Sequence, residues 1–320
     1  MNARKTLLAA LVTLLSMGAI AQGLENDTYF IMYDGQYLTN QRENIDGSIP
    51  QFTATRDDIK PQRQEWHISL DPETNRYKII NAQDNRYLNE NGQFSVSNST
   101  NPYEAVWHTY QILRLANGKY CIQNAGSAGN KFWTVDAGRV KQSGSTLLEP
   151  SNFIFDLVPV NGEAPQAPIT TTRDVYYIMD GTRYLTNTNP GGNGGTPTFK
   201  AVDTPGEAQE WRFTIDPAGK NYYKLTSDAD GRYVNEYSVF GTNPYYADWN
   251  TYLILTMDGM CSIQITQSAI DAFHGERWWN IKGDRLEIDE SLGRSSSYVI
   301  RIVPKGEVTG EDPEPGTLKV

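Results

Sequence analysis

The 320-residue chain is poor in cysteine and histidine, with two and three residues of these types, respectively. Two cysteines exclude the disulfide-dense scaffolds on which many small exported domains depend. Cys121 and Cys261 lie in similar segments, "NGKYCIQ" and "MDGMCSIQ", at matching points of two halves of the chain. Because equivalent core positions of separate domains rarely meet, we expect two buried free thiols.

The chain also lacks an excess of basic residues. It has 28 Lys and Arg against 38 Asp and Glu, which gives a net charge of −10. Nucleic-acid binding depends on clustered Lys and Arg that neutralise phosphates, and no such cluster follows the first few residues. We therefore expect no nucleic-acid partner, and binding to an anionic membrane surface is disfavoured for the same reason.

Long hydrophobic runs are missing after the N-terminus. The chain begins "MNARK", continues with an apolar run over Leu7–Ile20, and has a small-x-small sequence, "AIA", at Ala19–Ala21. This pattern is typical of a signal peptide, and the run is shorter than the roughly 18 apolar residues of a membrane span. We predict a signal peptide over residues 1–21, no transmembrane segment, and a mature protein that is secreted, periplasmic or associated with the cell surface. A buried N-terminal helix is the alternative interpretation.

The sequence offers little that is typical of a catalytic or metal site. His67 and His108 each follow a Trp in equivalent segments, which reflects an internal repeat and not a catalytic triad. No His or Cys spacing matches a metal motif, and "GGNGG" near Gly191 stands in no strand-to-helix context that would form a phosphate loop. We predict a non-enzymatic protein with no catalytic residue, no metal and no cofactor, while a glycosidase-type pair of carboxylates stays open.

Internal repetition is the strongest signal in the chain. "YFIMYDGQYLTN" begins at Tyr29 and "YYIMDGTRYLTN" begins at Tyr176. Later segments correspond in the same order: "QEWHISLDP" to "QEWRFTIDP", "DNRYLNE" to "DGRYVNE", "NPYEAVWHTY" to "NPYYADWNTY", "FWTVDAGRV" to "WWNIKGDRL" and "FIFDLVP" to "YVIRIVP". The shared order predicts a tandem duplication. We expect domains over residues 22–160 and 174–304, a short Pro/Thr-rich linker over 161–173, and an acidic, Pro-containing tail over 305–320.

Each half contains a finer, three-fold repeat. The units start at Tyr29, Tyr77 and Tyr120 in the first half, and at Tyr176, Tyr223 and Cys261 in the second. Every unit has a strand with alternate apolar residues, a turn rich in Gly, Asp or Asn, a second strand and a late strand with an aromatic residue. Long helical periods are absent, so we predict an all-β chain. Units this short cannot each bury a face alone, and three of them must close around a shared axis.

A Gln-x-Trp sequence near the end of a unit carries a family resemblance. Gln64-Glu-Trp66 and Gln209-Glu-Trp211 fit it, Trp107 and Trp249 keep only the Trp, and the third units have lost both residues. Over residues 28–160 and 174–304 the chain resembles the β-trefoil family, and more narrowly the ricin B-type lectin modules. The resemblance implies two tandem β-trefoil domains, and the four Trp are expected to fill the cores. The disulfides common in ricin-type units are missing.

The resemblance also implies candidate sugar-binding residues. In lectin-type trefoils an Asp of the first turn, an aromatic ring and an Asn or Gln amide hold a sugar in a shallow pocket. The matching trios are Asp34, Tyr37, Asn40; Asp84, Tyr87, Asn89; Asp180, Tyr184, Asn187; and Asp230, Tyr233, Asn235. The third units offer Trp133, which follows Phe132, and the pair Trp278 and Trp279. Neighbouring strand residues face opposite ways, so one ring of each pair is expected to point outward. The alternative is that the Asp and Asn residues only form turns.

The sequence predicts an exported, non-enzymatic, lectin-like protein that binds a glycan or polysaccharide through shallow pockets on several units. The alternative is a protein-binding or inhibitory β-trefoil pair that acts through exposed loops, with loops 40–61 and 189–198 as the candidates. A spacer module without a ligand is the third hypothesis. Outward aromatic rings beside Asp and Asn would favour sugar, whereas a broad apolar patch across loops would favour protein.

Overall fold

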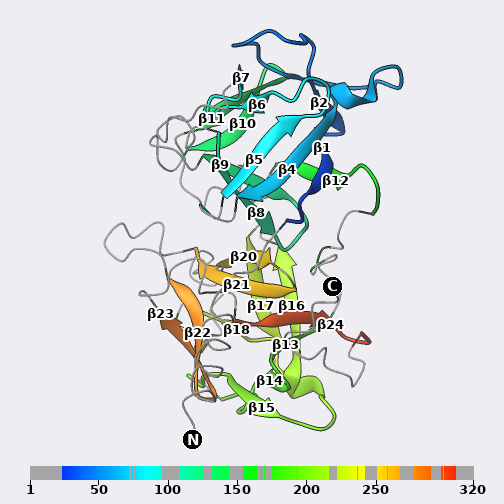
Figure 1. Cartoon of the computed structure of the whole chain (residues 1–320). Helices are drawn as coiled ribbons and strands as arrows, with labels where there is room; N and C mark the ends of the chain where they lie inside the picture. The colour runs from blue at the N-terminus through cyan, green and yellow to red at the C-terminus, as the bar shows by residue number, and fades with distance from the viewer. Residues whose placement is uncertain are drawn as a thin grey trace, which may run out of the picture.

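The computed structural model describes the chain over residues 24–71, 74, 76–95, 108–124, 131–143, 154–163, 167, 169, 175–192, 194–215, 222–235, 237–241, 251–257, 259–266, 277–289, 297 and 299–307. The predicted signal peptide lies outside these residues, as do Trp107, Trp249, His274 and most of the predicted linker and tail. The described strands gather in two bodies, which follow one another along the chain (Figure 1).

Over its described residues, the first body has twelve short strands and a 3-10 helix. The strands are β1 (Asp27–Tyr33), β2 (Gln36–Thr39), β3 (Gln51–Thr53), β4 (Glu65–Asp71), β5 (Arg76–Asn81), β6 (Tyr87–Leu88), β7 (Phe94–Ser95), β8 (Tyr110–Leu115), β9 (Tyr120–Asn124), β10 (Phe132–Asp136), β11 (Arg139–Ser143) and β12 (Asp156–Pro159), and helix η1 spans Pro61–Arg63.

Six of these strands close into a barrel. Antiparallel pairing runs from β1 to β4, β5, β8 and β9, and β12 returns to β1. The bridge between Tyr120 and Phe155, the residue before β12, closes the ring. The other six strands form three hairpins, β2–β3, β6–β7 and β10–β11. A six-stranded barrel with three hairpins in three repeated units is a β-trefoil.

The second body repeats this plan. Its strands are β13 (Val175–Asp180), β14 (Arg183–Thr186), β15 (Thr198–Ala201), β16 (Glu210–Ile215), β17 (Tyr223–Ser227), β18 (Tyr233–Val234), β19 (Phe240–Gly241), β20 (Thr251–Met257), β21 (Met260–Ile265), β22 (Trp278–Lys282), β23 (Arg285–Asp289) and β24 (Arg301–Pro304), with helix η3 at Glu207–Gln209. The barrel strands are β13, β16, β17, β20, β21 and β24, and the hairpins are β14–β15, β18–β19 and β22–β23. The predicted all-β, β-trefoil fold is confirmed, while the exact domain limits stay predictions.

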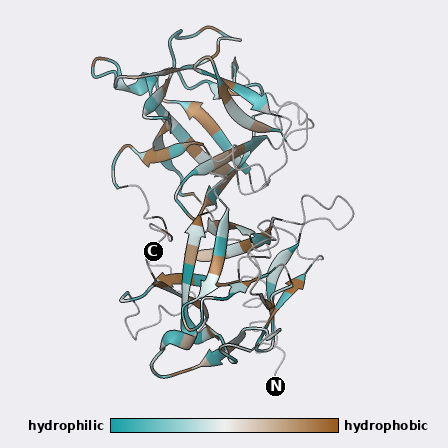
Figure 2. Ribbon diagram, turned by 180° about the vertical axis from the view of Figure 1, so that it is seen from behind, coloured by the Kyte–Doolittle hydropathy of each residue, from teal (hydrophilic) through white to brown (hydrophobic). Residues whose placement is uncertain are grey.

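Alternation of apolar and polar residues places one face of each strand in the core. In β5, Tyr77 and Ile79 are buried in the first core and alternate with half-buried residues. Figure 2 shows hydrophobic and hydrophilic residues interspersed along the strands of both bodies. Trp66 and Trp211 are fully buried, and their indole nitrogens donate to the carbonyls of Leu38 at 3.0 Å and Leu185 at 2.9 Å, respectively. The predicted core position of these two Trp is confirmed.

Both cysteines are free and buried, as expected. The two cysteines are not quite equivalent. The bridge from Cys261 to Ile300 matches the bridge from Tyr120 to Phe155, so the counterpart of Cys261 is Tyr120, one residue before Cys121. Cys261 therefore lies inside the second barrel, whereas Cys121 points out of the first. Burial raises the pKa of the Cys261 thiol to about 12. Within the described ranges, no helix is long and apolar enough to cross a membrane.

Candidate functional site

Each of the six units carries four cross-strand neighbours in line on its outer surface, which we call its outer row. In the first body the rows are Asp156–Met32–Tyr37–Thr53, His67–Ile80–Tyr87–Ser95 and Gln111–Gln123–Phe132–Ser143. In the second body they are Arg301–Met179–Tyr184–Lys200, Arg212–Thr226–Tyr233–Gly241 and Leu253–Gln264–Trp278–Asp289. The third member is aromatic in every row. It points outward because the next residue of the strand belongs to the core.

The six row aromatics differ in what covers them. Tyr37, Tyr87 and Tyr233 are half-buried and keep part of the ring open to solvent. Tyr184 is only 7% exposed. Phe132 and Trp278 are fully buried in an apolar cluster that joins the two bodies. Three of the four predicted tyrosines therefore present a partly open aromatic surface.

The surroundings of Tyr37 are aromatic and charged. Phe30 meets the Tyr37 ring edge to face, with 5.5 Å between ring centroids. The guanidinium of Arg56 lies 4.9 Å from the centroid of Phe30. Asp34 stands exposed in the adjacent turn at φ 48°, followed by Gly35 at φ 71°. This two-residue turn has the left-handed backbone that Asp-Gly hairpins favour.

Tyr233 has the least crowded row. Its cross-strand neighbours are Thr226 on one side and Gly241 on the other, and Gly241 has no side chain to cover the ring. In the following turn, the Asn235 side-chain oxygen accepts the backbone N–H groups of Tyr237 and Val239, both at 3.0 Å. The Tyr237 side chain is 66% exposed. Two tyrosines and one amide thus gather on hairpin β18–β19.

The hairpin turn that follows Tyr87 resembles the hairpin turn that follows Tyr233. Asn89 accepts the backbone N–H groups of Asn91 at 2.9 Å and Gln93 at 3.1 Å. His108 meets the Tyr87 ring edge to face at 5.9 Å. The predicted residues Asn89 and Asn235 therefore hold turns through their oxygens.

Tyr184 is covered by its own neighbours. It packs with Tyr177 and Met179 on the outside of the second barrel, and the two tyrosine rings lie 5.6 Å apart. Burial, followed by the nearby Glu210 carboxylate, raises the pKa of Tyr177. Asp180 forms an ion pair with Arg183 across the strand ladder. Asp180 therefore occupies the position of Tyr33 in the first body and is not the counterpart of Asp34.

Two of the four predicted trios do not hold together, because the side chains of Asn40 and Asn187 turn toward the next unit. Asn40 is fully buried, and its Nδ2 donates to Asp84 Oδ2 at 2.9 Å and to Asn81 Oδ1 at 2.9 Å. Asn187 repeats this arrangement, donating to Asp230 Oδ2 at 2.9 Å. Tyr37 and Asn40 thus face different surroundings, and the expectation that each trio lines one shallow pocket is wrong for Asn40 and Asn187.

The sequence-based search for sites missed two buried arginines that complete these contacts. Arg86 Nε donates to Asp84 Oδ2 at 2.8 Å, and the two side chains are 3% and 2% exposed. Arg86 also donates to the carbonyls of Arg42, at 2.8 Å, and Ile45. Its guanidinium lies 4.2 Å from the centroid of Phe94. The network fixes the loop after β2 to the second unit.

Arg232 performs the same function in the second body. Its Nε donates to Asp230 Oδ2 at 2.8 Å, and it also donates to the carbonyls of Asn189, at 2.8 Å, and Gly192. Burial alone would raise the pKa of Asp230, but hydrogen bonds from Arg232, the Gly191 N–H and Asn187 lower it to about 2. The repeated Asp-x-Arg of "DNRY" and "DGRY" is the sequence feature that marks the Asp84–Arg86 and Asp230–Arg232 pairs.

The Trp pairs behave only partly as expected. Trp133 and Trp279 point into the barrels, and Trp278 points outward, as does Phe132 beside Trp133. One ring of each pair points outward, as expected, but both outward rings are covered, and all four rings are fully buried. The sequence could not show this, because each outward ring is covered at the contact between the two bodies.

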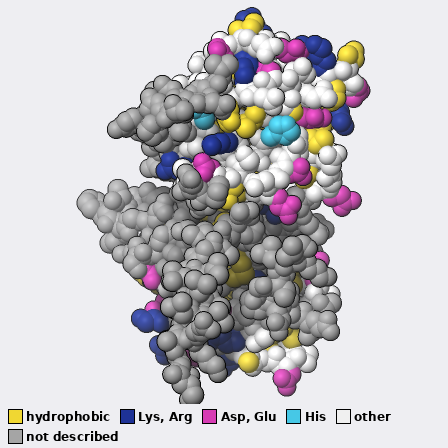
Figure 3. All heavy atoms as spheres, in the orientation of Figure 1, with side chains coloured by type: hydrophobic (Ala, Val, Ile, Leu, Met, Phe, Trp, Pro, Cys, Tyr) yellow, Lys and Arg dark blue, Asp and Glu magenta, His cyan; other side chains and the backbone are white. Residues whose placement is uncertain are grey.

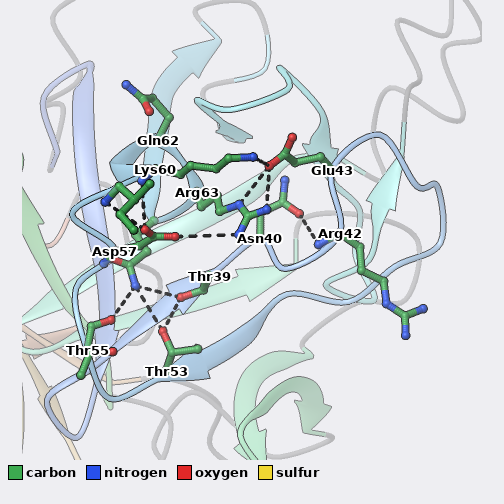
Figure 4. Close-up of polar contacts among 12 residues, drawn as sticks. Thr39, Asn40, Arg42, Glu43, Thr53, Thr55, Asp57, Lys60, Gln62 and Arg63 are labelled. Carbon is green, nitrogen blue, oxygen red and sulfur yellow. Dashed lines mark hydrogen bonds and ion pairs between the residues drawn. The ribbon is translucent and has the colours of Figure 1, made fainter.

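A polar network fixes loop 40–61, which includes the short strand β3, beside the Tyr37 row (Figure 4). Glu43 accepts hydrogen bonds from Lys60 Nζ at 2.9 Å and from Arg63 Nη2 at 2.7 Å, which lower the pKa of its carboxyl group. The Gln64 amide donates to Thr39 Oγ1 at 3.1 Å and to the carbonyl of Thr55 at 2.9 Å. The Gln of the Gln-x-Trp sequence therefore holds this loop in place.

Charged side chains of both signs are interspersed on the visible face of the first body (Figure 3). Among the described residues, no group of three or more His, Cys, Asp or Glu could hold a metal ion. The arrangement that remains for a ligand is a set of partly open tyrosine rings near carboxylates and amides.

No protein-family model matches the chain, and no curated protein matches it in sequence. Similar solved structures include a mosquitocidal holotoxin, at 16% identity over 88% of this chain and 34% of that chain, with a TM-score of 0.34. The agglutinin from Abrus precatorius is 12% identical over 89% of this chain and 98% of that chain, with a TM-score of 0.32. The designed three-fold symmetric protein ThreeFoil is 16% identical over 42% of this chain and 99% of that chain, with a TM-score of 0.33. The chain spans about a third of the holotoxin's length. The β-trefoil assignment rests on the strand pairing and not on these values.

Proposed function

We propose that the protein is a non-enzymatic carbohydrate-binding protein that holds sugars on the outer rows of Tyr37, Tyr87 and Tyr233. One observation carries the proposal: every unit places an aromatic residue at the same outward position, and three of these residues are partly open. A flat ring packs against the C–H face of a pyranose, while neighbouring polar groups bind its hydroxyls. The proposed partner is a glycan or polysaccharide outside the cell.

The Tyr233 row is the strongest of the three proposed sites. Gly241 leaves one side of the ring uncovered, and Tyr237 offers a second exposed ring on the same hairpin. The Asn235 oxygen is used by the turn, so its amide NH2 group is the part that would bind a sugar hydroxyl. At the Tyr37 row, the exposed Asp34 carboxylate would accept hydroxyl hydrogen bonds.

A glycan array of the chain from Gln22 onward tests the proposal. Wild-type protein should bind a selective group of glycans. Tyr233→Ala should weaken that binding about tenfold, for a ring contact of about 1.4 kcal/mol. Tyr37→Ala, Tyr87→Ala and Asp34→Ala test the other rows in the same assay.

Tyr184→Ala is the matched control, since its ring is already covered by Tyr177. It should leave glycan binding near the wild-type level. Each variant is first compared with the wild type by thermal unfolding, so that loss of binding is not confused with loss of fold. No binding to any glycan by a folded wild-type chain would refute the proposal.

Binding of a protein partner through loop 40–61 is the second candidate function. Ile59 is 92% exposed and Ile45 is 49% exposed, both in this loop. Because Glu43, Lys60 and Arg63 fix the loop, Ile59 is presented in a defined position. If the loop inhibits a protease, Ile59→Asp should abolish that inhibition and leave glycan binding unchanged. A panel of serine and cysteine proteases measures this directly.

A further inference from the structure

The two bodies meet through equivalent strands. β8 of the first body pairs antiparallel with β20 of the second, with Leu115 opposite Leu255 and Arg114 opposite Thr256. The backbone N–H of Ala116 extends this contact by donating to the carbonyl of Ile254 at 2.9 Å. Figure 1 shows β8 and β20 side by side where the two bodies approach each other.

Two sets of contacts establish that β8 and β20 are counterparts. Tyr110 of β8 pairs with Tyr77, and Tyr252 of β20 pairs with Tyr223. The Tyr110 hydroxyl donates to the carbonyls of residues 88 and 89, and the Tyr252 hydroxyl donates to those of residues 234 and 235. Tyr110 and Tyr252 therefore occupy the same place in the two barrels.

The register of the contact is that of a local two-fold axis. Arg114 lies as far beyond Tyr110 as Thr256 lies beyond Tyr252, so the two residues are equivalent, and they are opposite each other in the ladder. An antiparallel pair in which equivalent residues face each other is related by a two-fold axis through that pair. The contact is therefore isologous, as in a symmetric dimer.

Apolar side chains on the same face complete the contact. Leu115, Cys121 and Phe132 of the first body form one buried cluster with Leu253, Leu255 and Trp278 of the second. Phe132 and Trp278 are the aromatic members of the two third-unit rows, so equivalent positions meet from both sides. Each of the six side chains is fully buried.

We propose that β8 with the third unit of the first barrel, and β20 with the third unit of the second, each form a self-complementary docking face, and that the partner of each face is the equivalent face of the opposite barrel. The two bodies then behave as a symmetric dimer fused into one chain, held together by this face and not by the connecting segment. The contact buries the aromatic residues of both third-unit rows, so the partly open rows of Tyr37, Tyr87 and Tyr233 all lie in other units. This inference does not depend on the proposed carbohydrate binding.

Cutting the folded chain between the bodies tests the proposal. A site for a specific protease is inserted at residues 164–166, and the purified full chain is cleaved and examined by size-exclusion chromatography with light scattering. The cut protein should remain one particle with the mass of the whole chain. Separation of the wild-type halves at micromolar concentration would overturn the proposal.

Variants then locate the docking face. Leu255→Asp should weaken the association of the cut halves at least about ten- to a hundredfold, because it places a carboxylate in a buried apolar contact. Leu115→Asp, on the opposite face, should have the same effect because the two leucines are register partners. Ile59→Asp is the matched control, since Ile59 is 92% exposed, and its halves should stay together.

A disulfide trap provides a readout that does not require the variants to tolerate a buried charge. Leu115→Cys combined with Leu255→Cys should cross-link the two halves on mild oxidation, so that the cut chain stays whole on a denaturing gel without reductant. In a chain that also carries Cys121→Ser, which removes the native thiol of the same cluster, Ile59→Cys combined with Leu255→Cys places one cysteine in each half and should not cross-link. A cut chain that separates, or a register pair that fails to cross-link in the folded protein, would contradict the docking face.

Discussion

Replacing Arg86 should destabilise the protein more than any change at an exposed ion pair. The Arg86 and Asp84 side chains are 3% and 2% exposed, and the Arg86 guanidinium also binds the carbonyls of Arg42 and Ile45. Arg86→Met keeps much of the side-chain volume but leaves a buried carboxylate without its cation. Breaking a buried pair in this way costs about 3–5 kcal/mol.

Urea unfolding followed by tryptophan fluorescence measures this loss. For a slope of about 3 kcal/mol per molar urea, the midpoint should fall by about 1–1.7 M. Arg232→Met, in the second body, should give a similar loss because its contacts with Asp230 and the loop carbonyls repeat those of Arg86. Lys282→Met is the control, because the Lys282–Glu287 pair is exposed and worth about 0–1 kcal/mol.

The buried pair should also show strong coupling between Asp84 and Arg86. Asp84→Asn combined with Arg86→Met should cost clearly less than the sum of the single changes, since the double variant leaves no unpaired charge. A free energy of unfolding for Arg86→Met within about 1 kcal/mol of the wild-type value would show that the network does not hold the loop.

Three further outcomes follow from the same structure. Asp230 has a folded-state pKa of about 2, below its unfolded value of about 3.9, so its contribution to stability is present above pH 4 and is lost as the pH falls toward 2. Urea midpoints should therefore drop as the pH falls over this range. Arg232→Met should reduce that drop, because it removes the main partner of Asp230. Trp66→Phe should cost about 1–3 kcal/mol by leaving the Leu38 carbonyl without its indole donor, and equal urea midpoints for this variant and the wild type would contradict it. Both thiols should react with Ellman's reagent only on unfolding, because Cys121 and Cys261 are buried and the Cys261 pKa is raised; fast labelling of the native protein would speak against the buried positions.

The fold could be predicted from sequence because its signals are local and repeated. Period-two alternation, as in β5, marks strands whose buried face includes Tyr77 and Ile79. The order of the repeats then fixes how many units each barrel contains. The Gln-x-Trp segments reinforced this, and Trp66 and Trp211 lie in the cores where the resemblance placed them.

The candidate site was harder to predict because contacts between units are not visible in a linear motif. Tyr37 and Asn40 are neighbours in sequence, yet Asn40 turns to Asp84 of the following unit. The predicted trios assumed that residues close together in the sequence would also lie close together in space. The two arginines were missed because the repeated Asp-x-Arg of "DNRY" and "DGRY" shows neither that the Arg is buried nor that the Asp is its partner.

The residue type at the aromatic position of each outer row agrees with how that position is covered. Tyrosine occupies the four positions outside the third units, and at the three partly exposed ones a phenol hydroxyl can reach water or a ligand. In the contact between the bodies the first third unit has Phe132, which buries no polar atom, and the second has Trp278, whose indole N–H has no hydrogen-bond partner among the residues that the structure describes. One repeated position thus differs between units: with tyrosine it is partly exposed in three of them, and with phenylalanine or tryptophan it joins the bodies. The division follows from the two-fold contact, because a face that docks to its own counterpart must give up the same row in both barrels.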